Sequence, residues 1–158
     1  MTLADDIVSL AKFSKLKITC AESCTGGMVS AALTDIAGSS TIFEQGFITY
    51  SNLAKIKMLG VLPATLQAHG AVSEPVVEEM AIGALAAAGA NIAVSVSGIA
   101  GPGSTEFKPE GRVCFALAKS QFVYSETVEF GAIGRAEVRK FATNHALELI
   151  SKVLKTAY

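Results

Sequence analysis

The sequence predicts an α/β fold, a three-layer α/β/α sandwich with a mixed β-sheet. Short runs of β-branched residues alternate with segments whose apolar residues recur at helical spacing, and this alternation is typical of crossover connections between parallel strands. Two adjacent β-like runs near the end of the chain indicate a hairpin, which makes the expected sheet mixed. The 158 residues, 51% of them hydrophobic and 7% aromatic, suffice for one domain over 1–158 with a core of small aliphatic side chains.

The first half of the chain is expected to alternate helices and strands. Thr2 followed by Asp5 forms a capping-box pattern, which predicts a helix that begins there and ends near Ser14. The next expected elements are a strand at 16–20 whose β-like run continues to Glu22, a helix at 28–36, a strand at 43–50, and a short helix that Ser51 or Asn52 caps.

The second half is expected to begin with helices and end with a hairpin and a helix. Ser73-Glu74-Pro75 is typical of a helix start, and a short apolar strand at 91–97 is expected at the centre of the sheet. The other expected elements are a helix at 63–68, a long loop at 98–111, strands at 112–118 and 122–130, and a final helix at 135–155.

The expected helix at 75–89 is apolar nearly all round. Val76, Met80 and Leu85 form one face, and alanines form the other. A helix of this kind is buried within a domain or in a subunit interface. We therefore expect a homodimer or a higher homo-oligomer.

The turn Ser23-Cys24-Thr25-Gly26-Gly27 is the centre of the functional prediction. A strand that leads into a helix through such a turn exposes the first N–H groups of the helix, and these favour a phosphate or an oxyanion. The alternative is structural, with Ser23 or Thr25 as an N-cap and the two glycines as a tight turn.

Three loops are expected at one edge of the sheet, after Glu22, after Tyr50 and after Ser97. They are also the stretches richest in Ser, Thr, Gly and Tyr. Ligands of such sheets bind beyond the carboxyl ends of the strands. This coincidence favours a binding or catalytic site over a purely structural turn.

The available side chains favour serine chemistry with a lysine or a tyrosine as proton carrier. His69 and His145 are not spaced with an acid as a metal-ligand pair, and no histidine is expected beside a serine nucleophile. The loop at 98–111 matches no nucleotide-binding fingerprint. Lys55, one helical turn beyond Tyr50, is the candidate base, and a solvated helix lysine is the alternative.

Composition limits the partners and the location. The formal net charge is -1 and the sequence has no basic stripe, so no nucleic acid partner is expected. Three cysteines without a C-x-x-C pattern indicate reduced thiols. An acidic first segment unlike a signal peptide then favours a cytoplasmic location. The most apolar window, 80–90, is too short for a membrane span, and neither a metal nor a cofactor is expected.

Five blocks of residues lie in order along nearly the whole chain. They are TCAESCTGG at 19–27, DIAGSS at 35–40, GFITYSN at 46–52, GAVSEPV at 70–76 and SGIAGP at 97–102. Together they resemble the CinA carboxy-terminal domain family. This resemblance implies a three-layer α/β/α sandwich, in accord with the pattern of elements.

The resemblance also implies a set of site residues. Ser23 corresponds to the nucleophile of the family, Tyr50 and Lys55 to its catalytic tyrosine and lysine, and Arg135 to an active-site arginine. The expected substrate-binding residues are Thr25, Gly26, Gly27, Gly98, Gly101 and Arg135, with backbone N–H groups of the 25–27 turn as oxyanion donors.

Two positions depart from the pattern of the family. Gly134 stands where an aspartate usually precedes the arginine, and Arg112 stands in place of a threonine. Both changes concern substrate contacts more than the reaction, and Arg112 is an alternative ligand for a substrate phosphate.

Family members of this length resemble enzymes that hydrolyse the carboxamide of nicotinamide mononucleotide (NMN) to nicotinic acid mononucleotide and ammonia. Ser23 is expected to attack the amide after losing its proton to Lys55, directly or through Tyr50, while Cys24 is a packing residue. The alternative is a non-enzymatic nucleotide-sensing or protein-interaction module linked to competence or DNA damage. The serine, tyrosine and lysine together favour the enzyme, because a binding site needs no nucleophile and base.

Overall fold

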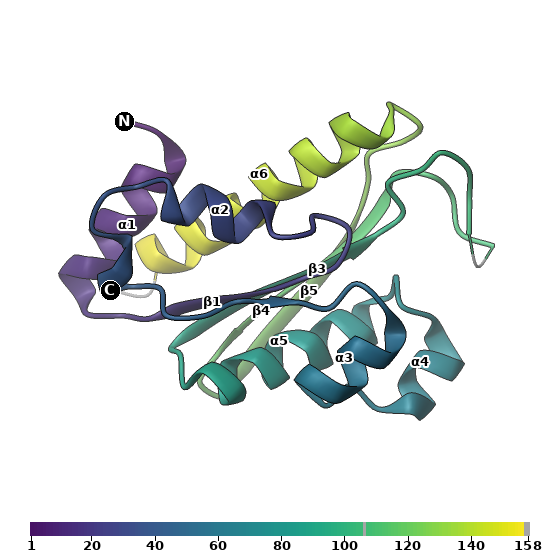
Figure 1. Ribbon diagram of the computed structural model, residues 1–158, viewed down its shortest axis with the longest axis horizontal. Helices are drawn as coiled ribbons and strands as arrows, with labels where there is room; N and C mark the ends of the chain where they lie inside the picture. Colours follow the sequence, from purple (N-terminus) through teal and green to yellow (C-terminus); the bar gives the residue numbers. More distant parts are fainter. Residues whose placement is uncertain (106, 157–158) are drawn as a thin grey trace.

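A mixed sheet lies between two layers of helices, which confirms the predicted fold class (Figure 1). The computed structural model describes residues 1–105 and 107–156, and within these residues five strands pair in the order β2-β1-β3-β4-β5. The strands are β1 (Ile18–Glu22), β2 (Phe47–Ile48), β3 (Ile92–Gly98), β4 (Arg112–Lys119) and β5 (Phe122–Glu129).

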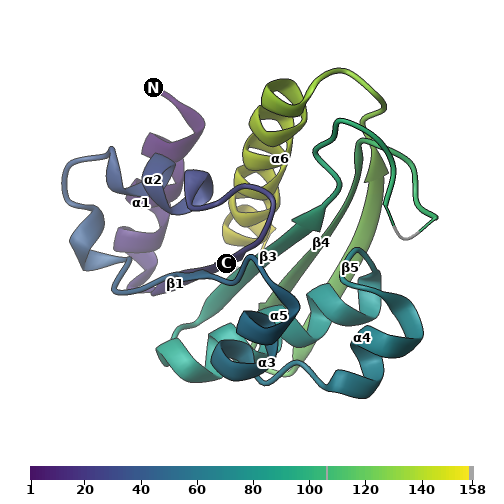
Figure 2. The ribbon, with the colours of Figure 1, turned by 45° about the vertical axis from the view of Figure 1, so that its right-hand side comes forward.

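The helices divide between the two faces of the sheet. In Figure 1 and Figure 2, α1, α2 and α6 cover one face, and α3, α4 and α5 cover the other. The helices are α1 (Leu3–Ser14), α2 (Met28–Thr34), α3 (Asn52–Leu59), α4 (Pro63–His69), α5 (Glu74–Ala88) and α6 (Arg135–Thr156), with a short 3₁₀ helix at Ser39–Thr41. No helix in the described part of the chain is both long enough and apolar enough to cross a membrane.

Parallel and antiparallel pairing occur in different halves of the sheet. Strands β2, β1 and β3 run parallel, whereas β4 and β5 are antiparallel to their neighbours. The strand predicted at the centre, β3, pairs with β1 on one side and β4 on the other. The loops after β1, β2 and β3 therefore leave the sheet at the same edge, as expected for a site there.

The two faces of the sheet differ in the size of their side chains. Toward α5 the sheet presents mostly alanines, among them Ala93 and its register partner Ala118. Toward α6 it presents larger side chains, such as Val94 and its partner Leu117. Small side chains let a helix approach the sheet closely, so the alanine-rich sequence of the central strands determines where α5 packs.

The second strand is much shorter than predicted. The segment expected as a strand at 43–50 pairs with β1 at Phe43, opposite Ile18, and again at Phe47, opposite Ala21. Between these two pairs the chain advances four residues, from Phe43 to Phe47, whereas β1 advances only three. The extra residue interrupts the ladder as a β-bulge does. The Thr19 hydroxyl donates to the carbonyl of Gln45 in this interruption (2.8 Å), which supplies a partner for the displaced backbone.

The predicted N-caps of α1 and α3 are confirmed, whereas the prediction that the Ser73 side chain caps α5 is wrong. The Thr2 hydroxyl accepts from the N–H of Asp5 (3.1 Å) within a complete capping box, and the Ser51 hydroxyl accepts from the N–H of Ala54 (3.1 Å). Ser73 occupies the N-cap position of α5, but its hydroxyl donates to the carbonyl of Gly70 (2.7 Å) and leaves the helix N–H groups uncapped.

Helix α5 packs against the sheet on one side and is covered only in part on the other. Val76, Val77 and Met80 are buried against the sheet, and α3 crosses α5 at Gly83. A Cβ at Gly83 would lie 1.9 Å from the carbonyl oxygen of Leu59, so only glycine permits this crossing. The face of α5 that suggested a subunit interface is thus covered in part by α3, and the homo-oligomer stays a prediction.

Candidate active site

The loops at the carboxyl ends of the parallel strands surround a cavity of about 370 Å³. The turn after β1, the segment between β2 and α3, and the loop after β3 all contribute to its wall. The cavity is lined by Ser23, Cys24, Tyr50, Asn52, Lys55 and Arg135, by 71–72, by 97–103 and by Thr105.

Ser23 and Lys55 meet in the wall of this cavity. The Ser23 Oγ and the Lys55 Nζ lie 3.0 Å apart. The Ser23 residue is 8% exposed and Lys55 only 1%, so the lysine is a buried residue and not the solvated helix lysine of the alternative interpretation. A serine hydroxyl in contact with a potential base is the first geometric requirement for a serine nucleophile.

The position of Lys55 follows from the local fold of α3. Ser51 caps the helix, and Lys55 and Leu59, four residues apart, are the two residues of α3 that are buried. The Lys55 Nζ also donates to the carbonyls of Thr49 (2.8 Å) and Tyr50 (3.2 Å). In its uncharged form the amine can keep these two hydrogen bonds and direct its lone pair at the Ser23 hydroxyl.

Tyr50 contacts the Ser23–Lys55 pair through its backbone and not through its side chain. Its carbonyl oxygen accepts from Lys55 and lies 3.4 Å from the Ser23 Oγ, whereas its hydroxyl accepts from Arg135 Nη2 (2.9 Å). The phenol of Tyr50 makes no hydrogen bond to Ser23 or Lys55 within the described residues. The predicted proton relay through Tyr50 therefore has no support from this geometry.

Glu22 occupies the helix N-terminus that the sequence suggested as an anion site. Its fully buried carboxylate accepts hydrogen bonds from the Thr25 hydroxyl (2.6 Å), from the N–H groups of Gly27, Val29 and Ser30 (3.1, 3.0 and 2.9 Å), and from the Ser30 hydroxyl (2.7 Å). The negative charge that the start of α2 favours is thus supplied by the chain itself.

This carboxylate engages the 25–27 turn, whose substrate-binding role stays a prediction. The Gly27 N–H donates to Glu22, the Gly26 N–H donates to the carbonyl of Ser23 (3.0 Å), and Thr25 is fully buried outside the cavity wall. Neither glycine amide is left to hold an oxyanion. The glycines serve the turn, since both have positive φ angles of 58° and 109°.

Helix α6 brings two arginines to the site, four residues apart. Arg135 donates to the carbonyl of Gly101 (2.7 Å) and to the Tyr50 hydroxyl, so it bridges two sides of the cavity. Arg139, which sequence reasoning missed, donates to the carbonyls of Cys24 (3.0 Å) and Thr25 (3.3 Å) and fixes the turn that carries Ser23. The spacing of one helical turn from Arg135 was the available signal for it.

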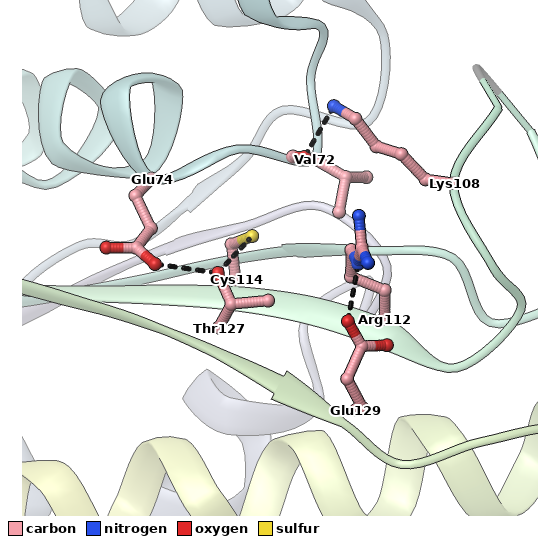
Figure 3. Close-up of polar contacts among 7 residues, drawn as sticks. All are labelled: Val72, Glu74, Lys108, Arg112, Cys114, Thr127 and Glu129. Atoms are coloured by element: carbon pink, nitrogen blue, oxygen red, sulfur yellow. Dashed lines mark hydrogen bonds and ion pairs between the residues drawn. The ribbon is translucent and has the colours of Figure 1, made fainter.

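Two of the predicted glycines and one alternative arginine can now be placed. Gly98 and Gly101 line the cavity. A Cβ at Gly101, whose φ is 91°, would lie 2.6 Å from the Glu110 Cδ, so the loop folds tightly there. Arg112 does not line the cavity, and its Nε donates to Glu129 (2.6 Å) in the ion pair drawn in Figure 3.

Lys108 fastens the outer wall of the cavity. Its Nζ donates to the carbonyls of His69 (2.6 Å) and Val72 (2.7 Å), and the second contact is visible in Figure 3. These bonds tie the loop at 98–111 to the connection between α4 and α5. Both tied segments line the cavity, although Lys108 itself is not among the lining residues.

Cys24 lies beside Ser23, the candidate nucleophile, but is buried. Burial raises the pKa of its thiol to about 12, although Lys55 and Arg139 favour the thiolate. Because a protonated thiol is a poor nucleophile, this thiol is not the attacking group at neutral pH. Among the described residues no three His, Cys, Asp or Glu side chains are grouped so as to hold a metal ion.

A serine in contact with a buried lysine, in a cavity at the carboxyl ends of parallel strands, is an arrangement that also occurs in enzymes with a serine nucleophile. The profile of the CinA C-terminal domain family matches residues 1–154. The chain therefore belongs to the CinA C-terminal domain family.

Known proteins of this family match almost the whole chain. The nicotinamide-nucleotide amidohydrolase PncC of Escherichia coli (strain K12) is 52% identical over 151 residues, 95% of this chain and 92% of that protein. A CinA-like protein of Shewanella sp. (strain W3-18-1) is 47% identical over 97% of this chain, which corresponds to 36% of that longer protein.

A solved structure has the same fold. The competence/damage inducible protein CihA from Agrobacterium tumefaciens superposes with a TM-score of 0.93 at 44% identity, over 98% of this chain and 94% of that one. The likeness extends over all the elements that build the cavity.

Proposed function

We propose that this protein hydrolyses the carboxamide of NMN to nicotinic acid mononucleotide and ammonia. The observation that carries the proposal is the 3.0 Å contact between Ser23 Oγ and Lys55 Nζ within the cavity. The amidohydrolase named for nicotinamide nucleotides at 52% identity supports the choice of substrate.

In the first half of the reaction, Ser23 Oγ attacks the carboxamide carbon while its proton passes to Lys55 Nζ. The cationic pyridinium ring of NMN withdraws electrons and makes this carbon more electrophilic than that of an ordinary amide. An amine held out of water is more easily kept uncharged, which suits Lys55 to accept a proton. Lys55 then returns the proton to the departing nitrogen, and ammonia leaves an acyl-enzyme.

In the second half of the reaction, a water molecule attacks the carbonyl carbon of the acyl-enzyme. Lys55 accepts a proton from the attacking water, the bond between Ser23 and the acyl group breaks, and the serine oxygen regains its proton. The Cys24 N–H, one residue beyond the nucleophile, donates to no carbonyl or carboxylate among the described residues and is our candidate oxyanion donor. Arg139 polarises the same region through the Cys24 carbonyl.

Arg135 is the proposed phosphate ligand. It has more N–H donors than the two that bind Gly101 and Tyr50, so a phosphate at the rim can be bound without breaking this bridge. Arg112 is less suitable, because it is paired with Glu129 outside the cavity wall.

The test is release of ammonia from NMN by the purified chain. Ser23→Ala is expected to reduce kcat about a thousandfold or more while the unfolding temperature stays within a few degrees. A chain that binds NMN tightly but releases no ammonia would instead support the nucleotide-sensing alternative. EDTA is expected to leave the rate unchanged, because the proposed chemistry uses no metal.

A further inference from the structure

The side chain of Tyr50 joins the two ends of the cavity. Its backbone lies at the Ser23–Lys55 pair, and its hydroxyl lies at Arg135. The ring therefore spans the distance between the proposed nucleophile and the proposed phosphate ligand. A substrate that reaches from Ser23 to Arg135 would therefore extend beside Tyr50, which contacts both.

The described part of the cavity wall presents basic groups and no carboxylate to a cationic substrate. None of the described residues that line it is Asp or Glu, and Lys55 and Arg135 are both basic. The face of an aromatic ring carries a negative electrostatic potential and attracts cations that lie within about 6 Å. Tyr50 is the aromatic residue of the described cavity wall and is 59% exposed, so a ligand in the cavity can reach it.

From these observations we infer that the Tyr50 ring is the platform on which the positively charged pyridinium ring of the substrate stacks. The hydrogen bond from Arg135 to the Tyr50 hydroxyl restrains the orientation of the ring. This inference rests on the proposed function and reassigns Tyr50 from proton transfer to recognition. It defines the substrate class as N-substituted pyridinium carboxamides, and the neutral dihydropyridine forms of the same molecules are bound less well.

The binding test uses the Ser23→Ala chain, which prevents turnover. Calorimetry would compare the Kd of NMN with that of its reduced, uncharged dihydro form. We expect a preference of about fivefold for the oxidised form with Tyr50 or Tyr50→Phe, and loss of this preference with Tyr50→Leu. Phe122→Leu, which removes an exposed aromatic residue on β5 outside the cavity, is the matched control and is expected to keep the preference.

Kinetics of the chain with Ser23 intact separate recognition from proton transfer. A proton carrier contributes about 10²- to 10⁴-fold to kcat. For a platform held by Arg135, Tyr50→Phe is expected to reduce kcat/KM less than tenfold, mainly through KM, and Tyr50→Leu to raise KM further. A hundredfold fall in kcat for Tyr50→Phe would overturn the inference.

The two proposals fail in different ways. If the wild-type chain releases no ammonia from NMN, the proposed function is wrong. If it does, but Tyr50→Leu still binds the oxidised form in preference to the reduced form, only the platform is wrong. Circular dichroism and unfolding temperature show whether each variant is folded, and the smaller Tyr50→Phe change keeps the kinetic test decisive if Tyr50→Leu is unstable.

Discussion

Cys24 is separated from the proposed nucleophile by a single peptide bond, yet its environment is that of a packing residue. It belongs to the hydrophobic cluster beneath α2 and α6 and is almost inaccessible to solvent. Its raised pKa, about 12, means that only a very small fraction is thiolate at neutral pH. We therefore expect the Cys24 thiol to be unreactive at neutral pH, in contrast to the neighbouring Ser23 hydroxyl.

We predict that iodoacetamide at pH 7.5 does not inactivate the enzyme. Cys24→Ala is expected to keep kcat within about threefold while losing about 1 kcal/mol of unfolding free energy, because a buried sulfur atom is removed. Ammonia release before and after alkylation measures the first effect, and denaturant unfolding measures the second. A loss of kcat of a thousandfold or more in a folded Cys24→Ala chain, with Ser23→Ala still active, would instead show that the thiol is the nucleophile.

Arg135 is expected to recognise the phosphate of NMN. Nicotinamide riboside lacks only this group, so kcat/KM for the riboside should be lower by one to two decades, about 1.5–3 kcal/mol for a charged hydrogen bond. Arg135→Ala should erase most of the difference, and Arg112→Ala is the matched control. If Arg135→Ala harms both substrates equally, the arginine only supports Tyr50 and Gly101; if Arg112→Ala alone erases the difference, the assignment is wrong.

Glu22 shows what a local pattern cannot reveal about a residue. Serine, threonine and glycine after a strand are equally typical of an anion site and of a capped turn, and the choice depends on where the carboxylate of Glu22 points. The structure places that carboxylate on the N–H groups of α2, where it receives five hydrogen bonds. The pattern still located Ser23, because its place at the end of β1 is set by chain order alone.

At the scale of the elements, one side chain ties the loop at 98–111 to its neighbour. Lys108 connects it to the α4–α5 segment, as described above. We predict that Lys108→Met, which removes the ammonium but keeps most of the side chain, raises KM for NMN about fivefold and changes kcat less than threefold. The loop would then hold the cavity wall less firmly.

Lys57→Met, on the exposed side of α3, is the control for Lys108→Met and should leave both constants as in the wild-type chain. Steady-state kinetics with ammonia detection provides the measurement. Equal changes in the two variants would mean that charge, and not the tie between the segments, is responsible.

The packing of α6 against β5 includes a titratable pair that makes stability depend on pH. Burial alone would raise the pKa of Glu126, but hydrogen bonds from Tyr124 (2.6 Å) and from the His145 ring outweigh it and lower the pKa below its usual value. Phe115 packs against the same imidazole, with ring centroids 4.5 Å apart. A carboxyl whose folded-state pKa is depressed stabilises the fold above its unfolded pKa and loses this contribution as the pH falls.

We therefore predict that Glu126→Gln lowers the unfolding free energy by about 1 kcal/mol at pH 7. The difference from the wild-type chain should shrink as the pH falls below the usual pKa of a glutamate and through the lower pKa of Glu126, where the wild-type carboxyl becomes protonated. Urea unfolding at a series of pH values measures it. A difference that stays constant down to pH 3 would mean that shape, and not charge, matters at this position.

At the scale of the whole molecule, the order of elements and the mixed sheet were predictable from periodicity, because each helix and strand buries one face or both. The interruption in β2 was not, since the extra residue between Phe43 and Phe47 becomes evident only against the partner strand. The position of the candidate site was predictable, because the loops after the parallel strands leave the sheet at the same edge. Arg139 and the orientation of Tyr50 depend on how α6 lies across the molecule, which no local pattern contains.

We still predict that the chain forms a homo-oligomer. Although α3 covers part of α5, apolar side chains on this side of the molecule stay accessible, including Ile82 at 51%, Leu53 and Leu62. Association would remove them from water. Light scattering at micromolar concentration is expected to give at least twice the mass of the chain, 16.3 kDa, and the monomer mass would contradict the prediction.

Helix α6 begins at the cavity with Arg135 and continues for 22 residues. At about 1.5 Å per residue its far end lies roughly 30 Å from that arginine. A tag, an immobilisation linker or a second protein attached at that end would thus be remote from the entrance to the cavity. The catalytic unit can be joined to other modules there without obstructing its substrate, which makes it a convenient part for building fusion enzymes.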